Sequence, residues 1–297
     1  MALPVGQQPK ESVHKTVLLN ETIDGLDLTG NPIVLDATFG GGGHSMEILR
    51  RFGNAKIIAF DQDKSAWREN DRRISFQNEN FAQINKILKS EKVDGIIFDL
   101  GLSSDQLENS GRGFSFLKDE PLLMTMKENP LSEDITAGEI VNTWGEKSLA
   151  DIIYGYGEER YARRIAKAIV EARQKGEIKT TFDLVKIISE AVPAVYRRGR
   201  LHFATRTFQS LRIAVNDELR VLQKGLEEGF KALKAGGRMS VISFHSLEDR
   251  VVKKFYKALE KEKKAILINK KPIIASAEEI KNNPRARSAK LRILEKI

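Results

Sequence analysis

The chain has 297 residues, of which 41% are hydrophobic and 30% are charged, and its formal net charge is +8. This length exceeds the usual size of a single hydrophobic core, so we expect one large domain and one smaller domain. The sequence contains no cysteine, which excludes disulfides and thiolate metal sites and disfavours both pyrimidine C5 methylation through a cysteine nucleophile and zinc-dependent base deamination.

Apolar runs in the sequence are short. The first 15 residues lack the apolar core of a signal peptide, and no run reaches the roughly eighteen apolar residues that a membrane span needs. We therefore expect a cytoplasmic protein with no membrane partner.

The most informative segment is a strand pattern that ends in a carboxylate and leads into four glycines. Residues 32–38 are mostly apolar up to Asp36, and Gly40–Gly43 precede His44. Glycine lacks a Cβ, so the backbone of such a loop can approach a ligand closely. A carboxylate beside the ligand repels a phosphate and suits a cation, which favours S-adenosylmethionine over NAD. A glycine-rich turn without a ligand stays an alternative.

Strand and helix patterns alternate through residue 101, which is typical of a parallel sheet covered by helices on both faces. Three of the strands end in Asp36, Asp61 and Asp99, which such a sheet brings to the edge where ligands bind. Asp61 follows the second strand and is placed to accept hydrogen bonds from ribose hydroxyls. The predicted strands are residues 32–38, 55–61, 73–77 and 93–99, and the helices between them are residues 45–52, 64–70 and 81–89.

After residue 110 the strand pattern stops and helical periodicity takes over, which predicts a helical domain inserted into the sheet domain. Thr180 and Thr181 are available to cap the last of its helices. We expect the sheet domain in two parts, residues 1–109 and 206–297, with the inserted domain at residues 110–205. The predicted helices are residues 141–154, 160–174, 182–192 and 206–233, and the later strands are residues 238–245, 265–268 and 289–295.

Positive charge is concentrated in two segments. Residues 160–212 contain 13 Lys and Arg against 4 Asp and Glu, and residues 251–297 contain 14 against 5. Such segregation favours a polyanion partner, because neutralising phosphates releases counterions. Arginine dominates the first segment and suits bidentate phosphate contacts, whereas a solvated basic face stays an alternative for either segment.

The end of the fourth strand is the candidate for chemistry. The exocyclic amine of cytosine or adenine is a poor nucleophile, so an enzyme must hold it in line with the methyl group and accept hydrogen bonds from its N–H groups. Asp99 and the neighbouring carbonyls are suitable acceptors, although Asp99 is equally suited to cap the next helix. His44 and His245 would point to the same sheet edge, although a lone histidine is more often structural.

Seven motifs, in order and over nearly the whole chain, resemble the bacterial ribosomal RNA small subunit methyltransferase H family. The resemblance implies an α/β fold, namely a class I (Rossmann-like) S-adenosylmethionine-dependent methyltransferase sheet with an inserted, mostly helical domain. It implies methylation of the N4 amine of a decoding-site cytidine in 16S rRNA, within the small ribosomal subunit or its precursor, and it leaves a homodimer open. The motifs are residues 36–45, 98–104, 112–116, 156–166, 204–213, 243–250 and 283–292.

The resemblance also implies roles for single residues, and it implies no metal. Asp99 and Ser103 are expected to be catalytic, and Arg206 and His245 are expected to orient the nucleotide. The residues expected to bind S-adenosylmethionine are Gly42, Gly43, His44, Asp61 at the ribose, Phe81 and Gln106 on the adenosine side, and Asp99.

Four positions depart from the family pattern, and the first is Thr16, which stands where the family has a proline. Leu123 and Thr125 stand where the family has an Asp and an Arg, and Phe203 stands where it has a proline. The cofactor motifs are intact, so these departures concern the substrate side. Two other functions stay open: a methyltransferase for another nucleic acid or a protein, and a non-enzymatic ribosome-assembly factor that binds through the same arginines.

Overall fold

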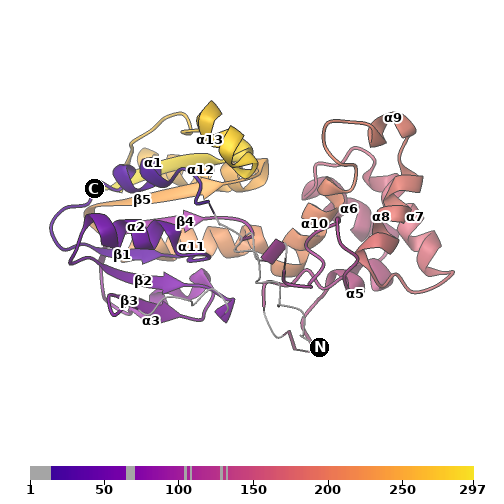
Figure 1. Ribbon diagram of the computed structural model, residues 1–297, viewed down its shortest axis with the longest axis horizontal. Helices are drawn as coiled ribbons and strands as arrows, with labels where there is room; N and C mark the ends of the chain where they lie inside the picture. The colour runs from indigo at the N-terminus through magenta and orange to yellow at the C-terminus, as the bar shows by residue number, and fades with distance from the viewer. Residues whose placement is uncertain (1–14, 65–70, 104–105, 108, 128–129, 132) are drawn as a thin grey trace, which may run out of the picture.

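The computed structural model describes residues 15–64, 71–103, 106–107, 109–127, 130–131 and 133–297. Figure 1 shows a sheet with helices on both faces, beside a body made of helices. Residues 65–70 of one predicted helix lie outside the described residues. Among the helices that are described, none combines the length and the apolar character that crossing a membrane requires.

The described strands form one seven-stranded sheet in the order β3-β2-β1-β4-β5-β7-β6. The pairs from β3 through β5 are parallel, whereas β7 runs antiparallel to both of its neighbours. This topology confirms the expected class I fold, and it makes β2, β1 and β4 adjacent, so that their carboxyl ends meet at one edge. The strands are β1 (Ile33–Asp36), β2 (Lys56–Phe60), β3 (Ile74–Gln77), β4 (Val93–Asp99), β5 (Leu233–Ser243), β6 (Ala265–Leu267) and β7 (Lys290–Lys296).

Side chains of the central strands alternate between two hydrophobic cores, because successive residues of a strand point to opposite faces. Leu35 and Ile96 belong to the core beneath one layer of helices, and their neighbours Val34 and Ile97 belong to the core beneath the other. Both faces of the sheet are therefore buried, as parallel sheets require. The first layer contains η2 (Phe81–Gln83), α3 (Ile84–Leu88), α11 (Glu218–Ala232) and α12 (Ser246–Lys261), and the second contains α1 (Leu19–Gly25) and α2 (Gly43–Arg51).

The helical body has a hydrophobic core of its own. Thr180 caps α8 by accepting a hydrogen bond from the Asp183 N–H, which confirms one of the two expected caps. Helix α10 also contributes Phe208 and Leu211 to this core, and the domain boundaries at residues 109/110 and 205/206 stay predictions. The helices are α5 (Ala137–Thr143), α6 (Glu146–Gly155), α7 (Ala162–Arg173), α8 (Thr181–Ala191), α9 (Ala194–Arg197) and α10 (Thr205–Asn216).

The long helix predicted at residues 206–233 is wrong, because the chain turns at Asp217 and forms α10 and α11. Asp217 has a left-handed backbone with φ 48°. The Asn216 side chain donates to the carbonyl of Met124 and accepts from the N–H of Met126, each at 2.8 Å. These tertiary contacts end α10 although the apolar periodicity continues.

Other boundaries also differ from the prediction. The helix predicted at residues 141–154 is divided into α5 and α6 around Trp144, whose ψ of 148° is extended. Strand β5 begins at Leu233, five residues before the predicted start at residue 238, and includes Gly236 and Gly237. Helices α1 and α12 were not predicted; the remaining elements are α13 (Ala277–Asn282) and η3 (Pro284–Ser288).

The packing of α11 on the sheet depends on the absence of a side chain at Gly225. A Cβ there would lie 2.4 Å from Cδ2 of Phe81, whose ring packs edge-on against Phe98. We expect Gly225→Ala to lower the free energy of unfolding by about 1–3 kcal/mol, as overpacking does in other cores. Urea titration measures this change. Gly155→Ala is the matched control, since a Cβ at Gly155 meets no described residue within 4 Å. An equal loss in both variants would contradict the packing argument.

Candidate active site

Asp36 ends β1 and is buried at the carboxyl edge of the sheet. Its Oδ2 accepts a hydrogen bond of 2.6 Å from the Ser45 hydroxyl, and its Oδ1 accepts one of 3.2 Å from the Thr38 N–H. Burial, opposed by these hydrogen bonds and reinforced by the charge of Asp61, raises the pKa of Asp36 to about 6. The first strand therefore delivers a carboxyl group that is costly to ionise.

The glycine loop lies between the ends of β1 and β2. The Gly40 N–H donates a 2.8 Å hydrogen bond to Oδ2 of Asp61, which ties the loop to the second strand. Gly40 and Gly42 have φ values of 52° and 73°, a left-handed backbone that favours glycine. At Gly43 a Cβ would lie 1.8 Å from Oγ1 of Thr16. The glycines are thus required by backbone conformation and by close packing.

Asp61 lies just beyond β2 and faces the loop. Its Oδ1 accepts a 2.9 Å hydrogen bond from the Asp63 N–H, while its Oδ2 holds the Gly40 N–H. Burial raises the pKa of Asp61 despite these hydrogen bonds. The side chain is therefore fixed in place before any ligand binds.

Asp99 ends β4, and its carboxyl group is the most strongly perturbed at this edge. The side chain is 20% exposed, yet among the described residues its buried Oδ1 has no hydrogen-bond partner. Burial, and then the negative charges of Asp36 and Glu248, raise its pKa to about 8. Its N–H donates to Oγ1 of Thr38 at 2.6 Å, which ties the ends of β4 and β1 together.

His44 is buried in the first turn of α2, directly after the glycines. Its Nδ1 lies 3.7 Å from Oδ2 of Asp99. The structure therefore brings His44, Asp36, Asp61 and Asp99 to one edge. Burial raises the pKa of all three acids, and the charge of Asp61 on Asp36 and of Asp36 on Asp99 adds to it, so this edge suits a positively charged group.

Ser103 and Gln106 form a reciprocal cap in the segment after β4. The Gln106 N–H donates to Oγ of Ser103, and the Ser103 N–H donates to Oε1 of Gln106, both at 3.1 Å. The capping alternative raised for this segment is thus filled by Ser103, which leaves the carboxylate of Asp99 available. Phe81, the other residue expected at the adenosine side, is partly buried against Phe98.

His245 begins α12 as its N-cap and is paired with Glu248. Its Nδ1 accepts from the Glu248 N–H at 3.4 Å, and its Nε2 lies 3.1 Å from Oε1 of Glu248. Glu248 is also one of the charges that act on Asp99, so His245 lies on the Asp99 side of the sheet edge. His245 and Arg212 lower the pKa of the buried Glu248 against the effect of burial.

One group of side chains in the described structure has the donors for a metal ion. Ligand atoms of Glu218, His245 and Glu248 lie within 4.8 Å of one another. Both oxygens of Glu218 already accept hydrogen bonds from Arg212, at 2.8 and 2.9 Å. A cation there would compete with a guanidinium, so the group functions as an internal ion network that fixes the start of α12.

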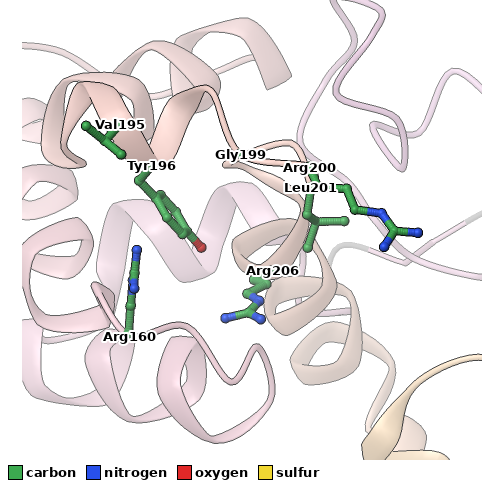
Figure 2. Close-up of a pocket in the computed structure, with 7 residues that line it drawn as sticks. All are labelled: Arg160, Val195, Tyr196, Gly199, Arg200, Leu201 and Arg206. Carbon is green, nitrogen blue, oxygen red and sulfur yellow. The ribbon is translucent and has the colours of Figure 1, made fainter.

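Arg206 lies at the start of α10, and the structure places it in a cavity of the helical body (Figure 2). Its Nη1 donates to the carbonyl of Glu158 at 2.9 Å. The Glu158 carboxylate accepts from the Ser246 hydroxyl at 2.7 Å and from Arg250 at 3.0 Å. Glu158 therefore connects the surroundings of Arg206 with the start of α12, beside His245.

Sequence reasoning missed a buried ion pair beside the glycine loop. Arg112 donates to Oδ2 of Asp63 at 2.9 Å and to the carbonyls of Met126 and Lys127 at 3.0 Å. The pair fixes the segment that contains the family departures Leu123 and Thr125 next to the loop after β2. A motif beginning at Arg112 was recognised, but its partner lies 49 positions earlier, so no local pattern joins the two.

Residues 11–297 match the model of the MraW methylase family. The chain belongs to this family. The match covers nearly the whole chain, and it confirms the resemblance carried by the seven motifs.

Relatives of the MraW methylase family match the chain over almost its full length. A protein from Lactobacillus johnsonii described as ribosomal RNA small subunit methyltransferase H is 42% identical to this chain, and the match covers 96% of this chain and 99% of that protein. The protein of the same description from Acetivibrio thermocellus is 45% identical to this chain, and the match covers 97% of this chain and 100% of that protein. A solved rRNA methylase from Streptococcus thermophilus has 12% identity and a TM-score of 0.45, covering 95% of this chain and 98% of that one.

The raised pKa of Asp99 makes stability depend on pH. The folded protein keeps this proton up to a pH of about 8, whereas the unfolded chain releases it near about pH 4. The free energy of unfolding that Asp99 removes from the protein therefore grows as the pH rises from about 4 to about 8. We expect Asp99→Asn to raise the Tm by nearly nothing at pH 4 and by several degrees at pH 8, as measured by calorimetry.

Asp94→Asn, at the other end of β4, is the control for this titration. Asp94 accepts hydrogen bonds from Lys234 and from the Ile33 N–H, so its loss should not raise the Tm. A Tm gain in Asp99→Asn that is the same at pH 4 and pH 8 would contradict the assignment.

Proposed function

We propose that this protein transfers a methyl group from S-adenosylmethionine to the N4 amine of a decoding-site cytidine in 16S rRNA. The relatives described as ribosomal RNA small subunit methyltransferase H support ribosomal RNA as the substrate. The carboxyl group of Asp99 carries the proposal within the site, because its buried Oδ1, at the edge that the glycine loop borders, has no partner in the part of the chain that the structure describes. A ligand N–H at this position would supply the missing hydrogen bond.

The residues at the sheet edge fit S-adenosylmethionine. The left-handed backbone at Gly42 and the packing of Gly43 against Thr16 fix the loop at this edge, and Asp61 is held in place to accept hydrogen bonds from ribose. The buried Asp36 offsets positive charge. When bound, S-adenosylmethionine supplies a methyl group activated by a sulfonium. Phe81 and Gln106 are proposed to contact the adenosine side.

Asp99 is proposed to hold the target amine. At neutral pH in the free protein, its raised pKa leaves this carboxyl group mostly protonated. A cation beside it lowers the pKa, which converts Asp99 into a carboxylate that accepts hydrogen bonds from the N4 amine. This interaction localises the lone pair on nitrogen and orients it toward the methyl carbon. Cofactor binding would thereby prepare the acceptor for the nucleotide.

The nucleotide is proposed to enter from the side of α12. His245 is fixed there by Glu248 and is 11% exposed, so its ring offers a polar surface in a fixed position beside Asp99. Ser103, whose hydroxyl caps the segment after β4, is proposed to contact the nucleotide from the side of β4. The basic segment at residues 160–212 supplies the charge for the flanking phosphates.

Asp61→Asn tests the cofactor half of the proposal. The amide can keep the hydrogen bond from the Gly40 N–H, so the loop is preserved while one acceptor and the charge are lost. We expect the Kd for S-adenosylmethionine to rise about 10- to 100-fold, which is the value of a hydrogen bond to a charged group. Isothermal titration calorimetry measures the change, and an unchanged Kd would contradict the role of Asp61.

Asp99→Ala tests the catalytic half in cells and in vitro. In a strain that lacks the gene, the wild-type protein should restore the methyl group on one cytidine of small-subunit rRNA, as seen by mass mapping of the purified RNA. Asp99→Ala should fail to restore it and should lower kcat at least about 100-fold, while S-adenosylmethionine still binds. Asp94→Asn is the matched control on the same strand and should restore the methyl group. Full activity of Asp99→Ala would contradict the proposal. The same rRNA mass in the wild-type strain and in the deletion strain would contradict it as well.

A further inference from the structure

A cavity of about 270 Å³ lies in the helical body, away from the strand ends that carry Asp36, Asp61 and Asp99. It is formed where α9 and the loop after it face the start of α10 and the segment before α7. Two of the seven motifs, residues 156–166 and 204–213, contribute to it, and the proposed cofactor site uses neither. Its lining includes Arg160, Val195, Tyr196, Gly199, Leu201 and Arg206 (Figure 2).

Two guanidinium groups are held in position within this cavity. That of Arg160 lies 4.8 Å from the ring centre of Tyr161 and 4.9 Å from that of Tyr196. That of Arg206 is held by the carbonyl of Glu158 at 2.9 Å. In Figure 2 the side chain of Arg160 lies beside the ring of Tyr196 and Arg206 lies below its hydroxyl, whereas Arg200 extends away from it. A guanidinium has five N–H donors, so each group keeps donors for an anion.

The carboxylate of Glu159, the residue before Arg160, is already occupied. Glu159 is fully buried, and it accepts hydrogen bonds from the Tyr196 hydroxyl and, at 2.8 Å, from the Tyr161 N–H. Burial and Glu159 raise the pKa of Tyr196 to about 12, so the phenol stays neutral. Glu159 thus positions the tyrosine against which Arg160 stacks, and it leaves the cavity with a surplus of positive charge.

The rim adds apolar surface to this charge. Val195 is 86% exposed and Leu201 is 46% exposed, although both are large apolar side chains. The volume is slightly below the roughly 300–1,000 Å³ of cavities that enclose drug-sized ligands, which suits a single nucleotide. Unstacked bases of RNA bind to aromatic rings, guanidinium planes and apolar side chains, and their phosphates bind to arginine.

We propose that this cavity binds one nucleotide of single-stranded RNA other than the nucleotide that is methylated. Arg160 and Arg206 hold its phosphate, and Val195 and Leu201 contact its base. The inference rests on the proposed function, since it identifies a second anchor for the same RNA. Glu158 supports the connection, because its carbonyl holds Arg206 while its carboxylate holds Ser246, the residue after His245.

The salt dependence of RNA binding tests whether the two arginines share one phosphate. A labelled single-stranded RNA with the decoding-site sequence is titrated by fluorescence anisotropy with wild type, Arg160→Gln, Arg206→Gln and the double variant. We expect each variant to bind about 10- to 100-fold more weakly near physiological salt. Because one phosphate is lost in every case, the slope of log K against log salt should fall by about 0.7 in the single variants and no further in the double variant.

Two other variants keep the test independent of folding. Val195→Glu places a carboxylate on an exposed rim position and should weaken binding at least about tenfold. Lys147→Gln is the charge-matched control, because Lys147 is exposed at the far end of α6 from Glu158, and it should bind within about twofold of wild type. Unchanged affinity in the arginine variants, or slope losses that add to about 1.4 in the double variant, would overturn the shared phosphate site.

The same proteins separate this inference from the proposed function. Methyl transfer to small subunits from the deletion strain reports the function, and anisotropy reports the cavity. If wild type transfers methyl groups while the arginine variants bind RNA normally, the cavity inference fails alone. If wild type transfers no methyl to the rRNA, the proposed function fails whatever the RNA affinity. Equal affinity for cytidine or adenosine monophosphate and for the RNA would identify a small-molecule site and overturn the inference.

Discussion

Three carboxyl groups meet at the edge of the sheet, and the rest of the site depends on their burial beside one another. Asp36 is affected by Asp61, and Asp99 is affected by Asp36 and by Glu248. Each carboxyl group is also buried away from water. The folded protein is therefore less stable than it would be with apolar side chains at these positions. Such a cost is typical of functional sites, and here it produces an edge that favours a cation over a phosphate.

The surrounding structure keeps these acids from relaxing. The Thr38 hydroxyl holds the end of β4, its N–H holds Asp36, and the Gly40 N–H holds Asp61. The left-handed residues of the glycine loop would be strained with other side chains. On the opposite side, Arg212, Glu218 and Glu248 fix the start of α12 and with it His245. The site is therefore rigid before a ligand arrives, which is the condition for accurate alignment of a methyl group and an amine.

Much of this arrangement could be predicted from sequence, because parallel strands with buried faces leave short apolar runs and their carboxyl ends meet at one edge. The acids at the ends of β1, β2 and β4 were identified from this rule alone. The break at Asp217 and the pairing of Arg112 with Asp63 could not be predicted, because both depend on contacts between distant segments. The cavity around Tyr196 was also missed, since it needs α9, α10 and the segment before α7 to be placed together. The residue roles taken from the family resemblance, Phe81 and Gln106 among them, stay predictions.

Proton release on ligand binding tests the central claim, that this edge holds a cation against buried carboxyl groups. Calorimetric titration at pH 7 in buffers of different ionisation enthalpy should show that S-adenosylmethionine binds with release of up to about one proton, because its charge lowers the pKa of Asp99. S-adenosylhomocysteine, which lacks the sulfonium charge, should release fewer protons. Equal proton release by the two ligands, or no binding of S-adenosylmethionine, would contradict the account.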